Sequence, residues 1–188
     1  AGNLNSPSIV SGDYDPAASA TRKRTRNWLD EQLPWIVDEG VDFLVLETFS
    51  WLDEALVALE LVADAGLERV VTVSMEREGR MTLDGFGPGE CAARLVDAGA
   101  DVVGINCLQR PAEILRSAAA MRKSVEVPIC CQPSAWHSWW SNSRSEEPEN
   151  FAEFARAGMA AGIGYLGSCC GAGPEHVRAM AEAMGKLD

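Results

Sequence analysis

The stretch Asp101-Val-Val-Gly-Ile-Asn-Cys107 is an apolar run that ends in an asparagine and a cysteine. A stretch of the same form, Gly164-Tyr-Leu-Gly-Ser-Cys-Cys-Gly171, follows further along the chain. Each run predicts a β-strand that leads into a helix. The carboxyl ends of the strands share one face of an α/β barrel. We therefore expect three distant thiols, those of Cys107, Cys169 and Cys170, to converge at that face.

Strands and helices alternate along the whole chain. Apolar runs predict five strands, at 41–46, 69–74, 101–106, 127–131 and 164–167, and a strand stub at 1–4. Helical spacing of apolar residues predicts helices at 15–40, 51–65, 90–98, 112–124, 151–161 and 174–184. Alternation with short connections is typical of the α/β class with a parallel sheet.

The number of predicted strands bears on the architecture. An (α/β)8 TIM barrel has eight strands and about 250 residues, whereas this chain has 188 residues. We therefore expect a barrel that lacks about two N-terminal βα units. Residues 1–188 would then form a single domain that is incomplete at its N-terminus.

Composition and charge exclude several classes of protein. A net charge of −12 argues against nucleic-acid binding. No apolar run approaches the roughly 20 residues of a membrane helix. Residues 1–5 show no signal-peptide pattern, so we expect a cytoplasmic protein. The six cysteines include two adjacent pairs and do not suggest a disulfide scaffold. In a reducing compartment such thiols are metal ligands, nucleophiles or core residues.

Three thiolates that hold zinc and leave a fourth position open suit the binding of a substrate thiol. A thiol bound to a metal is deprotonated near neutral pH. Adjacent cysteines are a weaker metal signature than Cys-x-x-Cys, because neighbouring side chains on a strand point apart. Gly167, Gly171 and Gly173 would permit a turn that brings both sulfurs inward. Spacing alone leaves a zinc site and buried core cysteines as alternatives.

Several motifs together resemble the homocysteine S-methyltransferase family, and within it the betaine–homocysteine branch. The two cysteine motifs occur in the family's order, and the resemblance extends over nearly the whole chain. The motifs are Gly104-Ile-Asn-Cys107, Gly167-Ser-Cys-Cys-Gly171, Asp84-Gly-Phe-Gly-Pro-Gly-Glu-Cys-Ala-Ala-Arg-Leu95, Asp97-Ala-Gly-Ala100, Gln132-Pro-Ser-Ala-Trp-His137 and Pro174-Glu-His-Val-Arg-Ala-Met-Ala181.

The resemblance implies an (α/β)8 barrel and a Zn2+ cofactor held by Cys107, Cys169 and Cys170. Its substrates would be homocysteine and a small cationic methyl donor such as betaine, and its product methionine. Glu47, at the end of its strand, matches the glutamate that binds the amino group of homocysteine. A carboxylate there is suited to pairing with an ammonium group.

Other polar and aromatic residues have two interpretations each. Asn106 orients the cysteine loop and the substrate site, or is a turn asparagine. His137 contacts the donor or only its own loop. Trp136, Trp139 and Trp140 form part of an aromatic box for a quaternary ammonium group, or anchor the loop.

The remaining cysteines and a histidine have simpler interpretations. We expect Cys130, Cys131 and Cys91 to be core or packing residues. His176, in the first turn of the last helix, is expected to be a surface or capping residue.

The chain departs from the family in two respects. Thr48 stands where the family usually has an aromatic residue, and the Asp-Gly-Gly motif of the family's first strand is absent. Two alternatives to betaine-dependent methyl transfer therefore stay open. One is a non-catalytic zinc-binding or regulatory remnant. The other is a homocysteine methyltransferase that uses S-methylmethionine, another sulfonium or a folate. A homo-oligomer, in which a second copy completes the site, is a further alternative.

Overall fold

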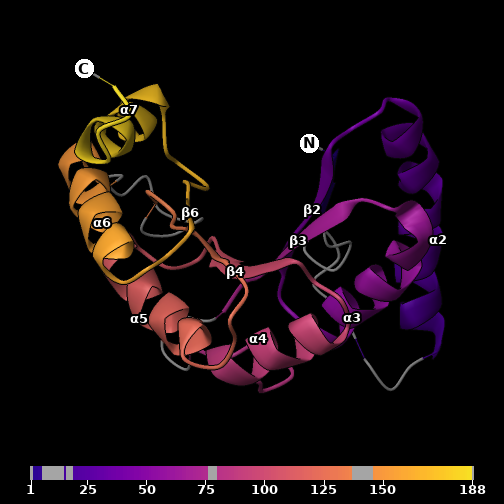
Figure 1. Ribbon diagram of the computed structural model, residues 1–188. Helices are drawn as coiled ribbons and strands as arrows, with labels where there is room; N and C mark the ends of the chain where they lie inside the picture. Colours follow the sequence, from indigo (N-terminus) through magenta and orange to yellow (C-terminus); the bar gives the residue numbers. More distant parts are fainter. Residues whose placement is uncertain (1, 6–14, 16–18, 76–79, 137–145, 188) are drawn as a thin grey trace.

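The computed structural model describes residues 2–5, 15, 19–75, 80–136 and 146–187. Strands and helices alternate through these residues (Figure 1). They are β1 (Gly2–Asn5), α2 (Ser19–Asp38), β2 (Phe43–Phe49), α3 (Leu52–Leu61), the 3-10 turn η1 (Ala63–Ala65), β3 (Glu68–Val73), α4 (Pro88–Asp97), β4 (Val102–Asn106), α5 (Pro111–Arg122), β5 (Ile129–Gln132), α6 (Pro148–Ala160), β6 (Tyr165–Leu166) and α7 (Pro174–Ala183).

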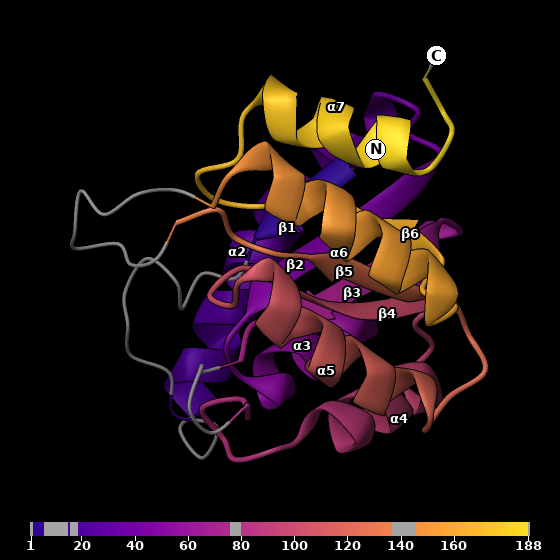
Figure 2. The same ribbon diagram turned by 90° about the vertical axis from the view of Figure 1, so that its left-hand side faces the viewer.

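The strands form one parallel sheet in the order β1-β2-β3-β4-β5-β6. Each neighbour in space is thus also the next strand along the chain. The sheet is curved, and the helices follow its outer side in an arc from α2 to α7 (Figure 1). Seen from the side in Figure 2, α5 and α6 run side by side over the outer side of the sheet.

The two faces of the sheet differ in chemistry because successive strand residues point to opposite sides. The side that meets the helices is apolar, and its residues belong to one buried core: Leu44, Leu46, Val71, Val73, Val103, Ile105, Ile129 and Cys131. The alternating positions form what we call the inner face. It carries Val45, Glu47, Val70, Thr72, Gly104, Asn106, Cys130 and Gln132. The inner face becomes polar toward the carboxyl ends of the strands.

Local sequence signals explain where the helices begin and end. Each of the helices α4, α5, α6 and α7 begins at a proline, which lacks the amide proton that the first helical turn leaves unpaired. Gly66, at the end of η1, has a φ of 69°, a left-handed conformation that glycine adopts without steric cost. Two of these helices, α5 and α7, follow the segments that carry Cys107 and the pair Cys169 and Cys170.

The α/β class, the parallel sheet, the five predicted strands and the N-terminal stub are confirmed. The helix expected over 51–65 divides into α3 and η1, and β2 continues beyond 46 to Phe49. Pro34 lies inside α2, which continues past it to Asp38. No helix among the described residues is long and apolar enough to cross a membrane.

Candidate metal centre

The two cysteine segments meet at the carboxyl ends of β4 and β6. Cys107 directly follows β4, and its amide donates to the carbonyl of Gln132 at 2.9 Å. The amide of Cys169, in the loop after β6, donates to the carbonyl of Pro133 at 2.8 Å. The carbonyl of Cys170 accepts from the amide of Ala135, also at 2.8 Å. The end of β5 and the residues directly after it therefore hold both cysteine segments by backbone hydrogen bonds.

The three thiols that the sequence analysis selected are brought together. The sulfur atoms of Cys107, Cys169 and Cys170 all lie within 4.8 Å of one another. The Cys107 and Cys170 sulfurs are 3.5 Å apart, and the Cys169 and Cys170 sulfurs 3.9 Å. Adjacent cysteines can both face the cluster because they lie in a loop, where strand alternation does not apply. Gly171 follows with a φ of 83°, so the chain turns sharply there.

The spacing of the sulfurs tests whether this site fits zinc. Zinc–sulfur bonds of about 2.3 Å in tetrahedral geometry place sulfur atoms roughly 3.8 Å apart. The observed separations of 3.5 and 3.9 Å bracket that value. The donor set therefore fits zinc in both number and spacing. The assignment of these residues as zinc ligands stays a prediction.

Hydrogen bonds among the thiols separate their pKa values. Donation from Cys169 and Cys170 to the sulfur of Cys107 lowers the pKa of Cys107, in spite of its burial. The hydroxyl of Ser134, 3.5 Å from the same sulfur, acts in the same direction. The pKa values of Cys169 and Cys170 are raised, chiefly by their hydrogen bonds to Cys107. These hydrogen bonds therefore favour the thiolate form of Cys107, and a thiolate is the form that binds metal.

Asn106 lies fully buried beside the cluster, and its side-chain amide is surrounded by hydrogen-bonding partners. Its Oδ1 accepts from the Thr48 amide at 3.1 Å and from the Thr72 hydroxyl at 2.9 Å. Its Nδ2 donates to the Thr48 hydroxyl at 2.7 Å and reaches the Cys169 sulfur at 3.8 Å. This side chain connects the ends of β2, β3 and β4 to the second cysteine segment. Its contact with substrate stays a prediction.

Glu47 lies near the end of β2, on the inner face and half-buried. Its negative charge adds to burial in raising the pKa of Cys130 to about 12. Cys130 lies three strands away, also on the inner face, so the field of Glu47 extends across this face. The role of Glu47 in binding an amino group stays a prediction.

The other predicted site residues have different outcomes. His137, Trp139 and Trp140 lie outside the described residues. Trp136 is described, and its indole ring occupies the space above Gly171, where an added Cβ would be 2.2 Å from the ring. It is 46% exposed, so the ring lies beside the cysteine loop with one side open to solvent.

The structure also tests the expectations for the remaining cysteines and for His176. Cys91, Cys130 and Cys131 are buried as expected, although Cys130 lies on the inner face and not in the apolar core. Of the two positions expected for His176, the capping position is confirmed and the surface position is wrong, because only 3% of the residue is exposed. Its Nδ1 accepts from the Gly173 amide at 3.0 Å, which caps α7, and its Nε2 donates to the Glu146 carbonyl at 2.8 Å.

Ser134, Thr72 and Ser74 are residues of this region that the sequence analysis did not select. Ser74 donates to the backbone carbonyl of Asn106 at 3.1 Å. Each of the three lies at or just after the carboxyl end of a strand, which is the signal that could have identified them. Hydroxyl residues are common in such positions, so the signal is weak.

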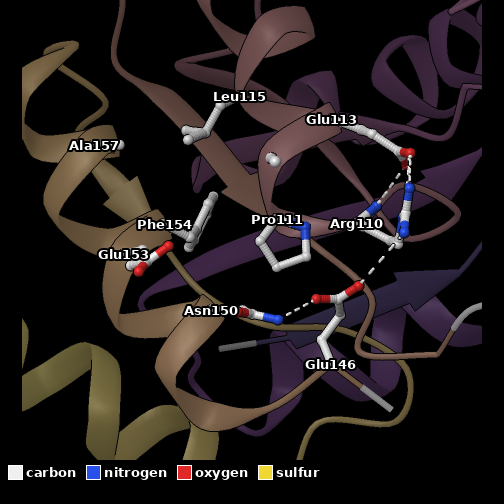
Figure 3. Close-up of a pocket in the computed structure, with 10 residues that line it drawn as sticks. Arg110, Pro111, Glu113, Leu115, Glu146, Asn150, Glu153, Phe154 and Ala157 are labelled. Atoms are coloured by element: carbon white, nitrogen blue, oxygen red, sulfur yellow. Dashed lines mark hydrogen bonds and ion pairs between the residues drawn. The ribbon is translucent and has the colours of Figure 1, made fainter. Parts of the chain in front are cut away.

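A cavity of about 400 Å³ lies away from the cysteines, between α5 and α6 (Figure 3). Arg110 at its rim donates to Glu113 at 2.7 Å and lies 3.9 Å from a carboxylate oxygen of Glu146. Phe154 and Pro111 face it from the two helices (Figure 3). None of the predicted site residues lines this cavity, so it is separate from the candidate metal centre.

Comparison with known proteins defines the class. A family model described as homocysteine S-methyltransferase matches residues 2–184. The chain therefore belongs to the homocysteine S-methyltransferase family.

Particular relatives add detail. The chain is 33% identical over 174 residues to betaine–homocysteine S-methyltransferase 1 of Pongo abelii, covering 82% of this chain and 42% of that protein. It is 30% identical over 181 residues to S-methylmethionine–homocysteine S-methyltransferase BHMT2 of the same organism, covering 86% and 49%. The chain thus spans less than half the length of these relatives.

Among solved structures, the metallated form of the homocysteine methyltransferase MmuM from Escherichia coli superposes with a TM-score of 0.75 at 19% identity. The superposition covers 97% of this chain and 60% of that one. It shows that the two chains share a fold.

Proposed function

We propose that this chain carries the zinc-binding part of a homocysteine S-methyltransferase that transfers a methyl group from a betaine-like cationic donor and yields methionine. The observation that carries the proposal is the convergence of Cys107, Cys169 and Cys170 within 4.8 Å, in a family defined by homocysteine methylation. The similarity to the betaine-dependent relative of Pongo abelii supports the choice of donor.

The architecture supports the same proposal. Parallel strands in sequential order with helices on the outer side are what consecutive βα units of an (α/β)8 barrel would show. We propose that this chain contributes six such strands to a barrel. The carboxyl ends of barrel strands carry the active sites of such enzymes, and the cysteine cluster lies at those ends.

Each residue of the site would have a separate role in the reaction. Cys107, Cys169 and Cys170 would hold the zinc ion, whose Lewis acidity would favour the thiolate form of a substrate thiol near neutral pH. Glu47 pairs with the ammonium group of homocysteine and directs its sulfur toward the cysteine cluster. Asn106 and Ser134 hold the cysteines in place through the contacts described above.

The transfer itself is a displacement in which the carbon–nitrogen bond of the donor breaks as the sulfur–carbon bond forms. The donor leaves as a neutral tertiary amine, so no proton has to be delivered to it. The contribution of the protein is then the alignment of sulfur, methyl carbon and leaving nitrogen.

The test combines two measurements on the purified protein. Zinc is quantified by atomic emission, and methionine formation is followed with homocysteine and a panel of donors that contains betaine, S-methylmethionine and a methylated folate. One zinc per chain and turnover with betaine support the proposal. Turnover only with another donor would overturn the choice of betaine. Bound zinc without turnover for any donor would favour a non-catalytic zinc-binding remnant.

A further inference from the structure

Thr48 has an unusual backbone conformation at the edge of the candidate site. Its φ is 66°, in the left-handed region that β-branched residues avoid. It lies where the pairing of β2 with β3 shifts register, between Leu46 and Phe49. An unfavourable conformation at a strand end persists only where surrounding contacts stabilise it, and such positions cluster at functional sites.

Among the described residues, the side chain of Asn106 holds Thr48 by two hydrogen bonds. Asn106 accepts from the Thr48 amide at 3.1 Å and donates to the Thr48 hydroxyl at 2.7 Å, so the asparagine holds the threonine at two points. These two hydrogen bonds, which we call the Thr48–Asn106 clasp, join residues 58 positions apart. The backbone N–H of Thr48 can only donate, so it requires the oxygen end of the Asn106 amide, and the Thr72 hydroxyl donates to the same Oδ1 at 2.9 Å.

The clasp lies between two parts of the proposed site. Glu47 directly precedes Thr48, so the backbone angle at Thr48 constrains the end of the strand that carries the carboxylate. The Nδ2 of Asn106 reaches the Cys169 sulfur at 3.8 Å, and Cys107 directly follows Asn106. One buried amide therefore connects the carboxylate to two of the three cysteines.

We propose that Thr48 and Asn106 are positioning residues whose clasp fixes the distance between Glu47 and the cysteine cluster, so that the site selects an amino thiol of the length of homocysteine. The proposal rests on the function proposed above. Three carbon atoms separate the nitrogen and sulfur of homocysteine, and two separate those of cysteine. If the distance between Glu47 and the cysteine cluster is fixed, cysteine is too short to contact both. If that distance can vary, both homocysteine and cysteine can bind.

The test compares Thr48→Val and Thr48→Ser with the wild type, all loaded with zinc. Valine keeps the shape of threonine and removes the hydroxyl, while serine keeps the hydroxyl. Calorimetric titration measures the Kd for homocysteine and for cysteine. We expect Thr48→Val to weaken homocysteine binding about tenfold, since a hydrogen bond to a buried amide is lost. We also expect Thr48→Val to reduce the ratio of the Kd for cysteine to the Kd for homocysteine. Thr48→Ser should stay within about twofold of the wild type.

A matched control separates positioning from general destabilisation. Thr25 is also buried, and its hydroxyl donates to Glu54 at 3.2 Å between α2 and α3, away from the cysteines. Thr25→Val makes the same chemical change and should leave both Kd values unaltered. Zinc content should remain one per chain in all variants. Amide hydrogen exchange at position 48, which needs no ligand, should be about tenfold faster in Thr48→Val, because one of the two hydrogen bonds of the clasp is lost and the other opens more often.

The outcomes distinguish the two proposals. Absence of homocysteine binding by the zinc-loaded wild type would overturn the proposed function and, with it, the selection of substrate length. Normal binding in the wild type together with an unchanged Kd and an unchanged preference in Thr48→Val would overturn the clasp proposal alone. An equal loss of affinity for homocysteine in Thr48→Val and Thr48→Ser would also overturn the clasp proposal alone.

Discussion

Gly104 is the position where the smallest possible substitution should have a large effect. It lies on the inner face of β4, paired with Cys130 of β5. A Cβ at this position would lie 2.1 Å from the carbonyl oxygen of Cys130 and 2.8 Å from its carbonyl carbon. Ordinary carbon–oxygen contacts are about 3.3 Å or longer, so the two strands would have to separate by roughly 1 Å. The conflicting atoms belong to the backbone and cannot rotate away.

We expect Gly104→Ala to destabilise the protein by about 3 to 5 kcal/mol. Overpacking of a buried site costs about 1 to 3 kcal/mol, and each of about two weakened interstrand hydrogen bonds adds about 1 kcal/mol. For a domain of this size, each kcal/mol corresponds to about 2 to 4 °C in Tm. Thermal unfolding followed by circular dichroism should therefore show a decrease of at least about 6 °C.

Gly87→Ala provides the control, because Gly87 has no neighbouring atom within 4 Å of an added Cβ and ends no strand. It precedes α4 as the N-cap residue, so alanine there should cost less than about 1 kcal/mol. A Tm for Gly104→Ala that equals that of Gly87→Ala would refute the reasoning, since the close approach of β4 and β5 would then have no energetic consequence.

Three further predictions concern the site. Cys170→Ala should lose zinc while its circular dichroism stays native, whereas Cys91→Ala should keep zinc; unchanged zinc in Cys170→Ala would contradict the ligand assignment. Glu47→Gln should raise the KM for homocysteine about ten- to hundredfold at unchanged zinc content, because a charge-assisted bond to the ammonium group is lost, and an unchanged KM would exclude that role. Burial raises the pKa values of Cys91 and Cys130 to about 12, so at pH 8 only about one such thiol in 10⁴ is ionised. Iodoacetamide added to the native protein without zinc should therefore modify the cluster of Cys107, Cys169 and Cys170 before Cys91 and Cys130, as read by peptide mass spectrometry. Equally rapid labelling of Cys91 would contradict this order.

The interpretation of Cys130 and His176 shows the limit of local reasoning. Both cysteines of the 130–131 pair are buried, as their place in an apolar run predicts. The sequence does not show that the negative charge of Glu47 reaches Cys130 on the inner face of the sheet. His176 lies in the first turn of a helix and is polar, which favours a surface or capping position. It caps the helix through the Gly173 amide, but from a buried site where it also bonds the carbonyl of Glu146. The local sequence pattern indicates which strand or helix a residue belongs to. The packing of the folded chain decides what surrounds its side chain.

The sequence by itself determined the order of strands and helices and the parallel class of the sheet. It also identified Cys107, Cys169 and Cys170 as candidate metal ligands. Apolar periodicity and the residues at strand ends are local properties of the chain, so both can be recognised without the structure. Only the tertiary structure decided that the Cys107 and Cys170 sulfurs lie 3.5 Å apart and that Asn106 holds Thr48. The physical reason is that such contacts depend on the register and curvature of the sheet. Register and curvature arise from the packing of all the helices on the outer side, and no short stretch of sequence encodes them.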